Sequence, residues 1–384
     1  MSHLRPVHVA VLVALAACAV LGVRLGTVCD GEIECMVLAG DRFTDPVVSG
    51  LPAEPGDGYD GQFLWRQARS PLNVDDGPVH GVTFDNEVRS GRVGYPAAAW
   101  VLSAGGQRAA VPWAMAALEV LSLAAIGWVL TVAARRADRS PWWGLAATAV
   151  PGLWFAAGRL LADPFVAALV GAGALALMSR RWRWAALLFS VAVLTKEQAV
   201  IVPAAFGLWR LWELWRARGD ATAGAARAGA AELAWVVPGV VFVAWQALLW
   251  ARTGSIPALE AGGTHAVVPG VDLVPAVISW LVPSGVSEVL WLVELVAFGA
   301  LGLVVLAARS STGWERVVAA AAIVFVAILN DNVFVDPAHF RQLGDLSVVL
   351  LIAALRAPVR WWAPIVGANV LATLGVAGRL FASL

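Results

Sequence analysis

Residues 183–216 carry the signal that decides the fold, and they read RWAALLFSVAVLTKEQAVIVPAAFGLWRLWELWR. Two apolar stretches flank Lys196 and Glu197, and Lys196 is the only lysine in the chain. As a helix, residues 184–195 would cover roughly 18 Å, which is less than the hydrocarbon core of a bilayer at about 30 Å. If this helix starts at one interface, Lys196 lies below the headgroups of the other. A charge at that depth must line a polar cavity or pair internally, so Lys196 is a functional-site candidate.

The whole chain has the composition of a helical membrane protein. Of its 384 residues, 60% are hydrophobic and 14% are charged, with a mean hydropathy of +0.75, whereas a soluble domain has about 25% charged residues. We predict an all-α, polytopic membrane protein that forms a single membrane domain over 1–384. Its transmembrane helices, about eleven in number, are expected at about 6–27, 109–134, 142–158, 161–179, 183–195, 198–216, 231–251, 287–308, 316–330, 343–356 and 361–381. Because no basic patch lies outside the short loops between them, nucleic acid is excluded as a partner.

Arginines at the ends of the apolar stretches predict the orientation. They fall on alternate loops, and by the positive-inside rule that face is cytoplasmic. The arginines that define it are Arg5, Arg135, Arg136, Arg139, Arg180, Arg181, Arg183, Arg216, Arg218, Arg227, Arg309, Arg316, Arg356 and Arg360. We therefore expect a multi-pass protein of the plasma (inner) membrane with a cytoplasmic N-terminus. The first apolar run also resembles a signal peptide ending near Cys18, but it continues to Val23, which favours a retained membrane helix.

The opposite, extracytoplasmic face receives the unusual polar clusters. Its long first loop, 28–92, holds twelve Asp or Glu residues against five arginines. A second extracytoplasmic segment, 252–286, is mostly apolar, and a helix along the interface is expected near 272–282. Cys29 and Cys35 lie in the first loop, where a disulfide and two free thiols are both open. Since the clusters fall on one face, we predict that they meet in one site.

The first loop contains a glycine-rich acidic motif, residues 56–63, which read GDGYDGQF. Either Asp57 or Asp60 could act as a general base towards an alcohol. The alternatives are a solvated acidic turn or a weak calcium site, because closely spaced aspartates often bind hard cations. A divalent cation therefore stays open as a cofactor, although no Cys/His metal spacing and no Gly-rich phosphate loop is present.

Basic candidates lie in two other extracytoplasmic loops. Arg159 could bind a phosphate or merely anchor at the interface, and Asp163 could be its polar partner or merely a helix N-cap. His339 and Arg341 approach a late apolar stretch. The arginine fork matches phosphate geometry, and the histidine could donate to phosphate or move a proton. The alternatives are an ordinary loop histidine and an interfacial anchor.

Two further sets of charges need partners. Lys196 and Glu197 could pair with each other, but neighbours in a helix point about 100° apart, so separate partners are the stronger expectation. Glu119 and Glu294 lie inside apolar stretches, where hydrogen bonds between helices would account for them.

The order of these motifs resembles the GT-C superfamily of membrane glycosyltransferases, which use polyprenyl-phosphate sugars as donors. The matching segments run over about 50–345 and are Tyr59-Asp60-Gly61-Gln62-Phe63, Arg92-Val93-Gly94-Tyr95-Pro96, Asp163-Pro164, Thr195-Lys196-Glu197 and Arg341. One departure concerns the acid. The paired Asp-Glu dipeptide of some branches is replaced here by Asp57-Gly58-Tyr59-Asp60.

The resemblance implies sugar transfer to an acceptor hydroxyl, usually with inversion, and basic residues that stabilise the leaving phosphate. Asp60, or else Asp57, would be the general base. The residues implied for lipid-phosphate binding are Arg159, Lys196, Arg341 and His339. Those implied for substrate contact are Gln62, Asp163 and Glu197. The implied partners are a polyprenyl-phosphate-linked sugar, membrane lipids and an acceptor glycan, lipid or protein.

A secondary transporter and a non-catalytic membrane assembly protein are the rival functions. A transporter should show broken helices and polar residues near the midplane in both halves. The polar clusters of this sequence fall on one face instead, which favours the glycosyltransferase.

Overall fold

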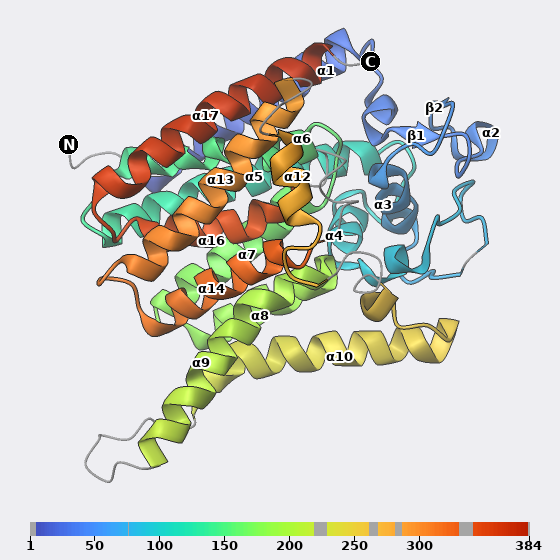
Figure 1. Cartoon of the computed structure of the whole chain (residues 1–384). Helices are drawn as coiled ribbons and strands as arrows, with labels where there is room; N and C mark the ends of the chain where they lie inside the picture. Colours follow the sequence, from blue (N-terminus) through green and yellow to red (C-terminus); the bar gives the residue numbers. More distant parts are fainter. Residues whose placement is uncertain are drawn as a thin grey trace.

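The computed structural model describes residues 5–75, 77–218, 229–260, 268–280, 286–329 and 341–382. Its longer helices form one bundle (Figure 1). They are α1 (Pro6–Thr27), α5 (Val111–Arg136), α7 (Asp163–Met178), α8 (Trp182–Thr195), α9 (Ile201–Arg218), α10 (Leu233–Thr253), α13 (Val286–Ala307), α14 (Gly313–Ala327), α16 (Gly344–Ala354) and α17 (Val359–Ala382). All lie within a few residues of the predicted stretches. Helix α16 is buried along its whole length and contacts α5, α7 and α13, so its apolar circumference makes it the centre of the core.

The helices have the properties of membrane spans. Among the described residues, α1, α5, α10, α13 and α17 are each long and apolar enough to cross a membrane, and α7 and α8 are shorter apolar helices. The chain is therefore an all-α, multi-pass membrane protein. In Figure 1 the N-terminus lies at the left-hand end of the bundle, and both strands lie at the right-hand end. The number of about eleven spans and the cytoplasmic N-terminus stay predictions.

The expected helix at 142–158 is broken. A 3₁₀ segment, η3 (Pro141–Ala149), comes first, and α6 (Pro151–Ala157) follows. Val150 between them has extended backbone angles, φ −129° and ψ 86°. The physical reason is Pro151, which has no N–H to continue the helical hydrogen bonds and restricts the residue before it.

The long first loop and the helix that follows it form a cap, residues 28–75 and 77–102, at the right-hand end of the bundle (Figure 1). Its elements are η1 (Ile33–Val37), β1 (Ala39–Gly40), α2 (Pro46–Ser49), β2 (Ala53–Glu54), α3 (Asp60–Arg69), η2 (Glu87–Gly91) and α4 (Gly94–Leu102). The strands β1 and β2 pair in parallel, and Cys29 and Cys35 form a disulfide. Buried Trp65 and Tyr95 share a core with Met115 of α5, so the cap is continuous with the bundle.

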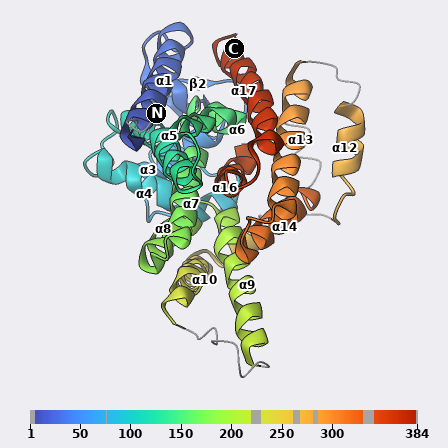
Figure 2. The ribbon, with the colours of Figure 1, turned by 90° about the vertical axis from the view of Figure 1, so that its left-hand side faces the viewer.

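The remaining expectations concern α12 and two buried glutamates. Helix α12 (Leu273–Trp280) lies beside α13 (Figure 2) and falls within the range predicted for an interface helix. The Tyr95 hydroxyl donates a hydrogen bond to Glu119 at 2.7 Å, and the Gly152 N–H donates to Glu294 at 3.3 Å. Each carboxyl group thus has one oxygen in a hydrogen bond between elements, as expected, while its Oε2 is buried without such a bond.

Candidate active site

Asp60 is presented by a tight glycine loop at the start of α3. Gly58 has a φ of +67°, a region that favours glycine. A Cβ on Gly58 would lie 2.2 Å from the backbone nitrogen of Gly40, so the two backbones are in direct contact. The Gln62 side chain holds this contact, because it accepts from the Gly40 N–H at 3.1 Å and donates to the Asp57 carbonyl at 2.7 Å. Helix α3 therefore begins at a fixed point, with Asp60 as its first residue.

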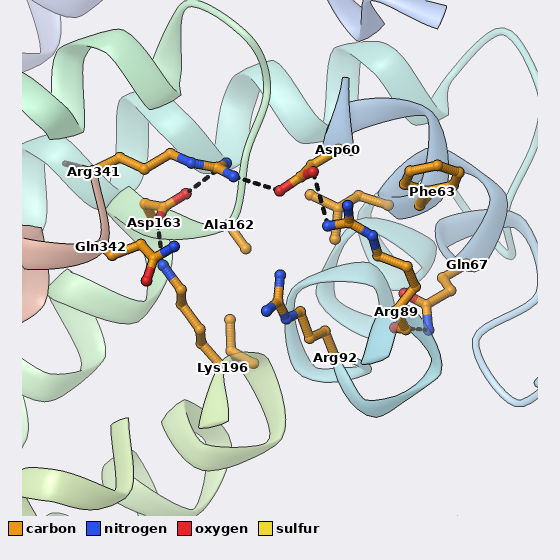
Figure 3. Close-up of a pocket in the computed structure, with 12 residues that line it drawn as sticks. Asp60, Phe63, Gln67, Arg89, Arg92, Ala162, Asp163, Lys196, Arg341 and Gln342 are labelled. Carbon is orange, nitrogen blue, oxygen red and sulfur yellow. Dashed lines mark hydrogen bonds and ion pairs between the residues drawn. The ribbon is translucent and has the colours of Figure 1, made fainter. Parts of the chain in front are cut away.

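A second close contact sets α3 against the turn between α6 and α7. A Cβ on Gly61 would lie 2.4 Å from the carbonyl oxygen of Val37 and 3.1 Å from that of Arg159. Only a glycine allows this approach. Because α7 begins at Asp163, just after that turn, the carboxylates of Asp60 and Asp163 reach the same space (Figure 3).

Asp60 is held between two guanidinium groups. Its Oδ1 lies 2.8 Å from Nη1 of Arg89, and its Oδ2 accepts from Nη2 of Arg341 at 2.5 Å. Burial raises the pKa of Asp60, but the attraction of Arg89 and Arg341 outweighs burial and holds that pKa well below its usual range. Asp60 is therefore ionised at any physiological pH.

Asp163 joins the lysine to the same group of charges. Its Oδ1 accepts from Nζ of Lys196 at 2.5 Å, and its Oδ2 from Nη1 of Arg341 at 3.4 Å. The Asp163 and Lys196 side chains are only 5% and 9% exposed, so each charge depends mainly on its protein partner. Arg341 thus bridges the two carboxylates, one from the cap and one from the bundle (Figure 3).

Glu197 has a separate partner, as the sequence predicts. Its Oε1 lies 3.1 Å from Nε of Arg92, and Lys196 takes Asp163 instead. The two segments meet because Gly94 has no side chain: a Cβ there would lie 2.3 Å from Oγ1 of Thr195. The start of α4 is therefore fixed against the end of α8.

These groups line a cavity of about 30 Å³, room for about two water molecules. The lining residues are Asp60, Phe63, Leu64, Gln67, Arg89, Arg92, Ala162, Asp163, Thr195, Lys196, Arg341 and Gln342. Four of these side chains are cations and two are carboxylates, and two further carboxylates just outside the lining, Glu197 and Asp85, pair with Arg92 and Arg89. The cavity lies where α7 begins and α8 ends, and in Figure 3 the Arg92 guanidinium faces its centre. Guanidinium and ammonium groups gathered in this way are the side chains that bind phosphate oxygens in proteins.

Four of the predicted site residues, Asp60, Asp163, Lys196 and Arg341, line this cavity. Glu197 lies one step away, paired with Arg92.

The other predicted residues lie elsewhere. Asp57 is on the surface, paired with Arg42 at 2.9 Å with a 64% exposed side chain. Gln62 is fully buried in the cap, where it also accepts from the Thr44 hydroxyl, and it is not among the lining residues, so its substrate contact stays a prediction. The Arg159 guanidinium lies over the Phe155 ring, 3.7 Å from its centroid. His339 lies outside the described residues.

Two lining arginines were not predicted as site residues. Both belong to the cap: Arg89 looks like an ordinary arginine of an acidic loop, and Arg92 begins a segment of the resemblance but was given no role in the site. Arg89 is oriented by Asp85, which accepts from its Nε and Nη2 at 2.9 Å each. A spacing of four residues between an acid and an arginine is the signal that could have drawn attention to it.

The divalent cation left open by the sequence has no fitting site in the described part of the chain. No group of three or more His, Cys, Asp or Glu side chains there is placed to hold a metal ion. Both oxygens of Asp60 are already occupied by guanidinium groups. We therefore derive no step through a metal.

Fold and site together define a helical membrane protein with a cation-rich cavity at one end of the bundle. No protein-family model matches the chain, and no curated protein matches it. Among solved structures, the chain is similar to the crystal structure of ArnT from Cupriavidus metallidurans bound to undecaprenyl phosphate. The sequences are 17% identical with a TM-score of 0.49, over 97% of this chain and 65% of that one. The chain thus spans about two thirds of the length of that protein.

Proposed function

We propose that this protein is a membrane glycosyltransferase that moves a sugar from a polyprenyl-phosphate donor to an acceptor hydroxyl. The reaction would take place on the extracytoplasmic face of the plasma membrane. The observation that carries the proposal is Asp60, a half-buried carboxylate between Arg89 and Arg341 in a cavity at the end of apolar helices. A polyprenyl phosphate carries its phosphate at headgroup level and its chain in the bilayer, which suits a charged cavity in that position.

The phosphate of the donor would bind among the lining cations. Lys196 and Arg341 already meet at Asp163, and Arg92 faces the centre of the cavity (Figure 3). Guanidinium groups bind phosphate oxygens in pairs, so these cations suit the phosphate monoester that leaves. Asp163 is a positioning residue in this scheme, because it holds Lys196 and Arg341 side by side.

Donor binding and base activation are linked in this geometry. A carboxylate with a depressed pKa is a poor base, and Asp60 has both arginines bound to it. A cavity of about 30 Å³ cannot take a phosphate while every ion pair stays in place. A donor phosphate that draws Arg341 away would weaken the pairing of Asp60, so the carboxylate becomes more basic only when the donor is bound.

The transfer itself is a single displacement. The acceptor oxygen forms a bond to the anomeric carbon while the bond from that carbon to the phosphate oxygen breaks. The electron pair leaves with the phosphate, whose growing charge the cations stabilise. The proton of the acceptor hydroxyl passes to Asp60, and the configuration at the anomeric carbon inverts.

A panel of labelled polyprenyl-phosphate sugars, incubated with the full chain in nanodiscs, tests the proposal. Asp60→Asn should lower transfer roughly 10²–10⁴-fold, the usual contribution of a general base. Asp57→Asn is the matched control, because it makes the same change on the surface nearby, and it should transfer like the wild type.

Both variants are compared by thermal unfolding, so that a misfolded protein is not mistaken for an inactive one. Wild-type transfer with an active Asp60→Asn variant rejects Asp60 as the base. Failure of the wild type to transfer any sugar in the panel rejects the function.

A further inference from the structure

A second hollow lies at the other end of the helices that form the cavity. It is a groove of about 180 Å³ between α5, α7 and α8. Helix α7 contacts both α5 and α8 (Figure 2). Helix α7 begins at the charged cavity and ends at this groove, and α8 runs the opposite way. The groove is therefore at the face that carries the arginine-rich loops.

The walls of the groove are apolar and face outwards. Ala172 of α7 is small, and it leaves space between Trp128 of α5 and Leu188 of α8. Trp128 is 44% exposed and Trp184, at the rim, is 57% exposed. Exposed apolar side chains on helices of this composition contact lipid, and a hydrocarbon chain fits such a surface.

The mouth of the groove is positively charged. Arg136 and Arg181 both line it, and no carboxylate is among its described lining residues. Arg136 donates to the hydroxyl of Ser179 and to the carbonyl of Leu175, the latter at 3.4 Å. Its guanidinium is thereby fixed at the end of α7, next to the apolar wall.

We propose that this groove binds one anionic glycerophospholipid of the leaflet at the arginine-rich face. One acyl chain lies against Ala172 and Leu188, and the phosphate lies between Arg136 and Arg181. The charge complementarity selects an anionic headgroup, and the apolar wall selects a lipid over a free phosphate. The proposal does not depend on the glycosyltransferase reaction, because the groove and the cavity share no lining residue.

Native mass spectrometry of the delipidated full chain in detergent tests the headgroup contact. Phosphatidylglycerol and phosphatidylcholine are titrated separately. The wild type should retain phosphatidylglycerol more tightly, and Arg136→Gln/Arg181→Gln should lose at least about tenfold in affinity for it. The control is Arg135→Gln/Arg183→Gln, which removes the same charge from exposed positions outside the groove and should bind like the wild type.

The acyl contact has its own pair of variants. Ala172→Phe fills the groove and should lower retention of phosphatidylglycerol, whereas Ala117→Phe, at an exposed position of α5 outside the groove, should not.

Three results overturn the proposal. They are equal retention of the two lipids by the wild type, equal losses in the groove pair and the control pair, and stronger retention of a polyprenyl phosphate than of phosphatidylglycerol at this site. Thermal unfolding of each variant accompanies the titrations. If Ala172→Phe unfolds, the arginine pairs still decide the question.

Discussion

The charged side chains at the two ends of the α7–α8 pair differ in burial. At the cavity, Asp163 and Lys196 are buried and bound to each other. At the groove, Arg136 and Arg181 are exposed on an apolar rim. Buried charges depend on their partners, because water cannot replace them, whereas exposed charges cost little and stay accessible to a ligand. The charges of the cavity are therefore held mainly by one another, whereas the charges of the groove are open to a ligand from the surroundings.

The largest expected effect is on the free energy of unfolding, and it tests directly whether the charges at the two ends differ. Asp163→Ala removes the carboxylate that pairs with Lys196 and one of the two that pair with Arg341. It should lower the free energy of unfolding by about 3–5 kcal/mol. The groove pair Arg136→Gln/Arg181→Gln should change it by no more than about 0.5 kcal/mol. Denaturation in detergent, followed by tryptophan fluorescence, measures both.

A double variant tests whether the loss of stability comes from the lysine charge that is left unpaired. Asp163→Ala/Lys196→Met removes both charges of the pair, and it should be more stable than Asp163→Ala alone. Equal stability of the single variant and the groove pair would mean that the cavity charges are as well solvated as the exposed ones.

The next effect concerns turnover. Arg92 faces the centre of the cavity, and Arg92→Gln should lower the transfer rate roughly 10²-fold, as expected when one group that stabilises a transition-state charge is lost. Glu197→Gln removes the partner of Arg92 but keeps the cation, so its loss should be much smaller. Steady-state rates with one donor measure both. Equal losses of transfer rate in the two variants would show that Arg92 serves only to join the cap to α8.

The smallest effect is a pH dependence. The folded pKa of Asp60 lies below its ordinary value of 3.8. Its contribution to stability is therefore complete above that value and is lost as the pH falls through the lower, folded pKa. The difference in unfolding temperature between the wild type and Asp60→Asn should stay constant from about pH 8 to about pH 5 and shrink below about pH 4.

The groove gives the contrast for this measurement. Because no carboxylate lines it among the described residues, the small difference between the wild type and Arg136→Gln/Arg181→Gln should stay the same over the whole range. An Asp60 difference that does not shrink below about pH 4, or a wild type that gains stability over the variant as the pH falls, would show that its pKa is not depressed.

Much of the helical fold could be predicted, because hydropathy is a local property of the chain. The ranges of α1, α5, α7 and α8 follow from apolar stretches and the charges at their ends. The break at Val150 was not predicted, because hydropathy does not depend on whether a residue has a backbone N–H. The proline at position 151 is the feature of the sequence that indicates the break.

The site could be predicted only in part. Asp60, Asp163, Lys196 and Arg341 were expected to share a site, and they do line one cavity. Arg89 was missed because its only local signal is an aspartate four residues earlier, and such a spacing does not show that the arginine reaches a site. Its role as a cavity residue depends on η2 lying against α3, which is a tertiary contact.

The sequence by itself determined which segments are apolar helices, which ends carry the arginines, and that Lys196 needs a partner inside the protein. Only the tertiary structure decided that the partner is Asp163, that Asp60 rather than Asp57 reaches the cavity, and that Arg341 bridges the two carboxylates. The physical reason is distance along the chain. Burial preferences act residue by residue, but the Asp60–Arg341 pair joins positions 281 residues apart, and such pairs are fixed only when the glycine contacts at Gly61 and Gly94 hold the cap against the bundle.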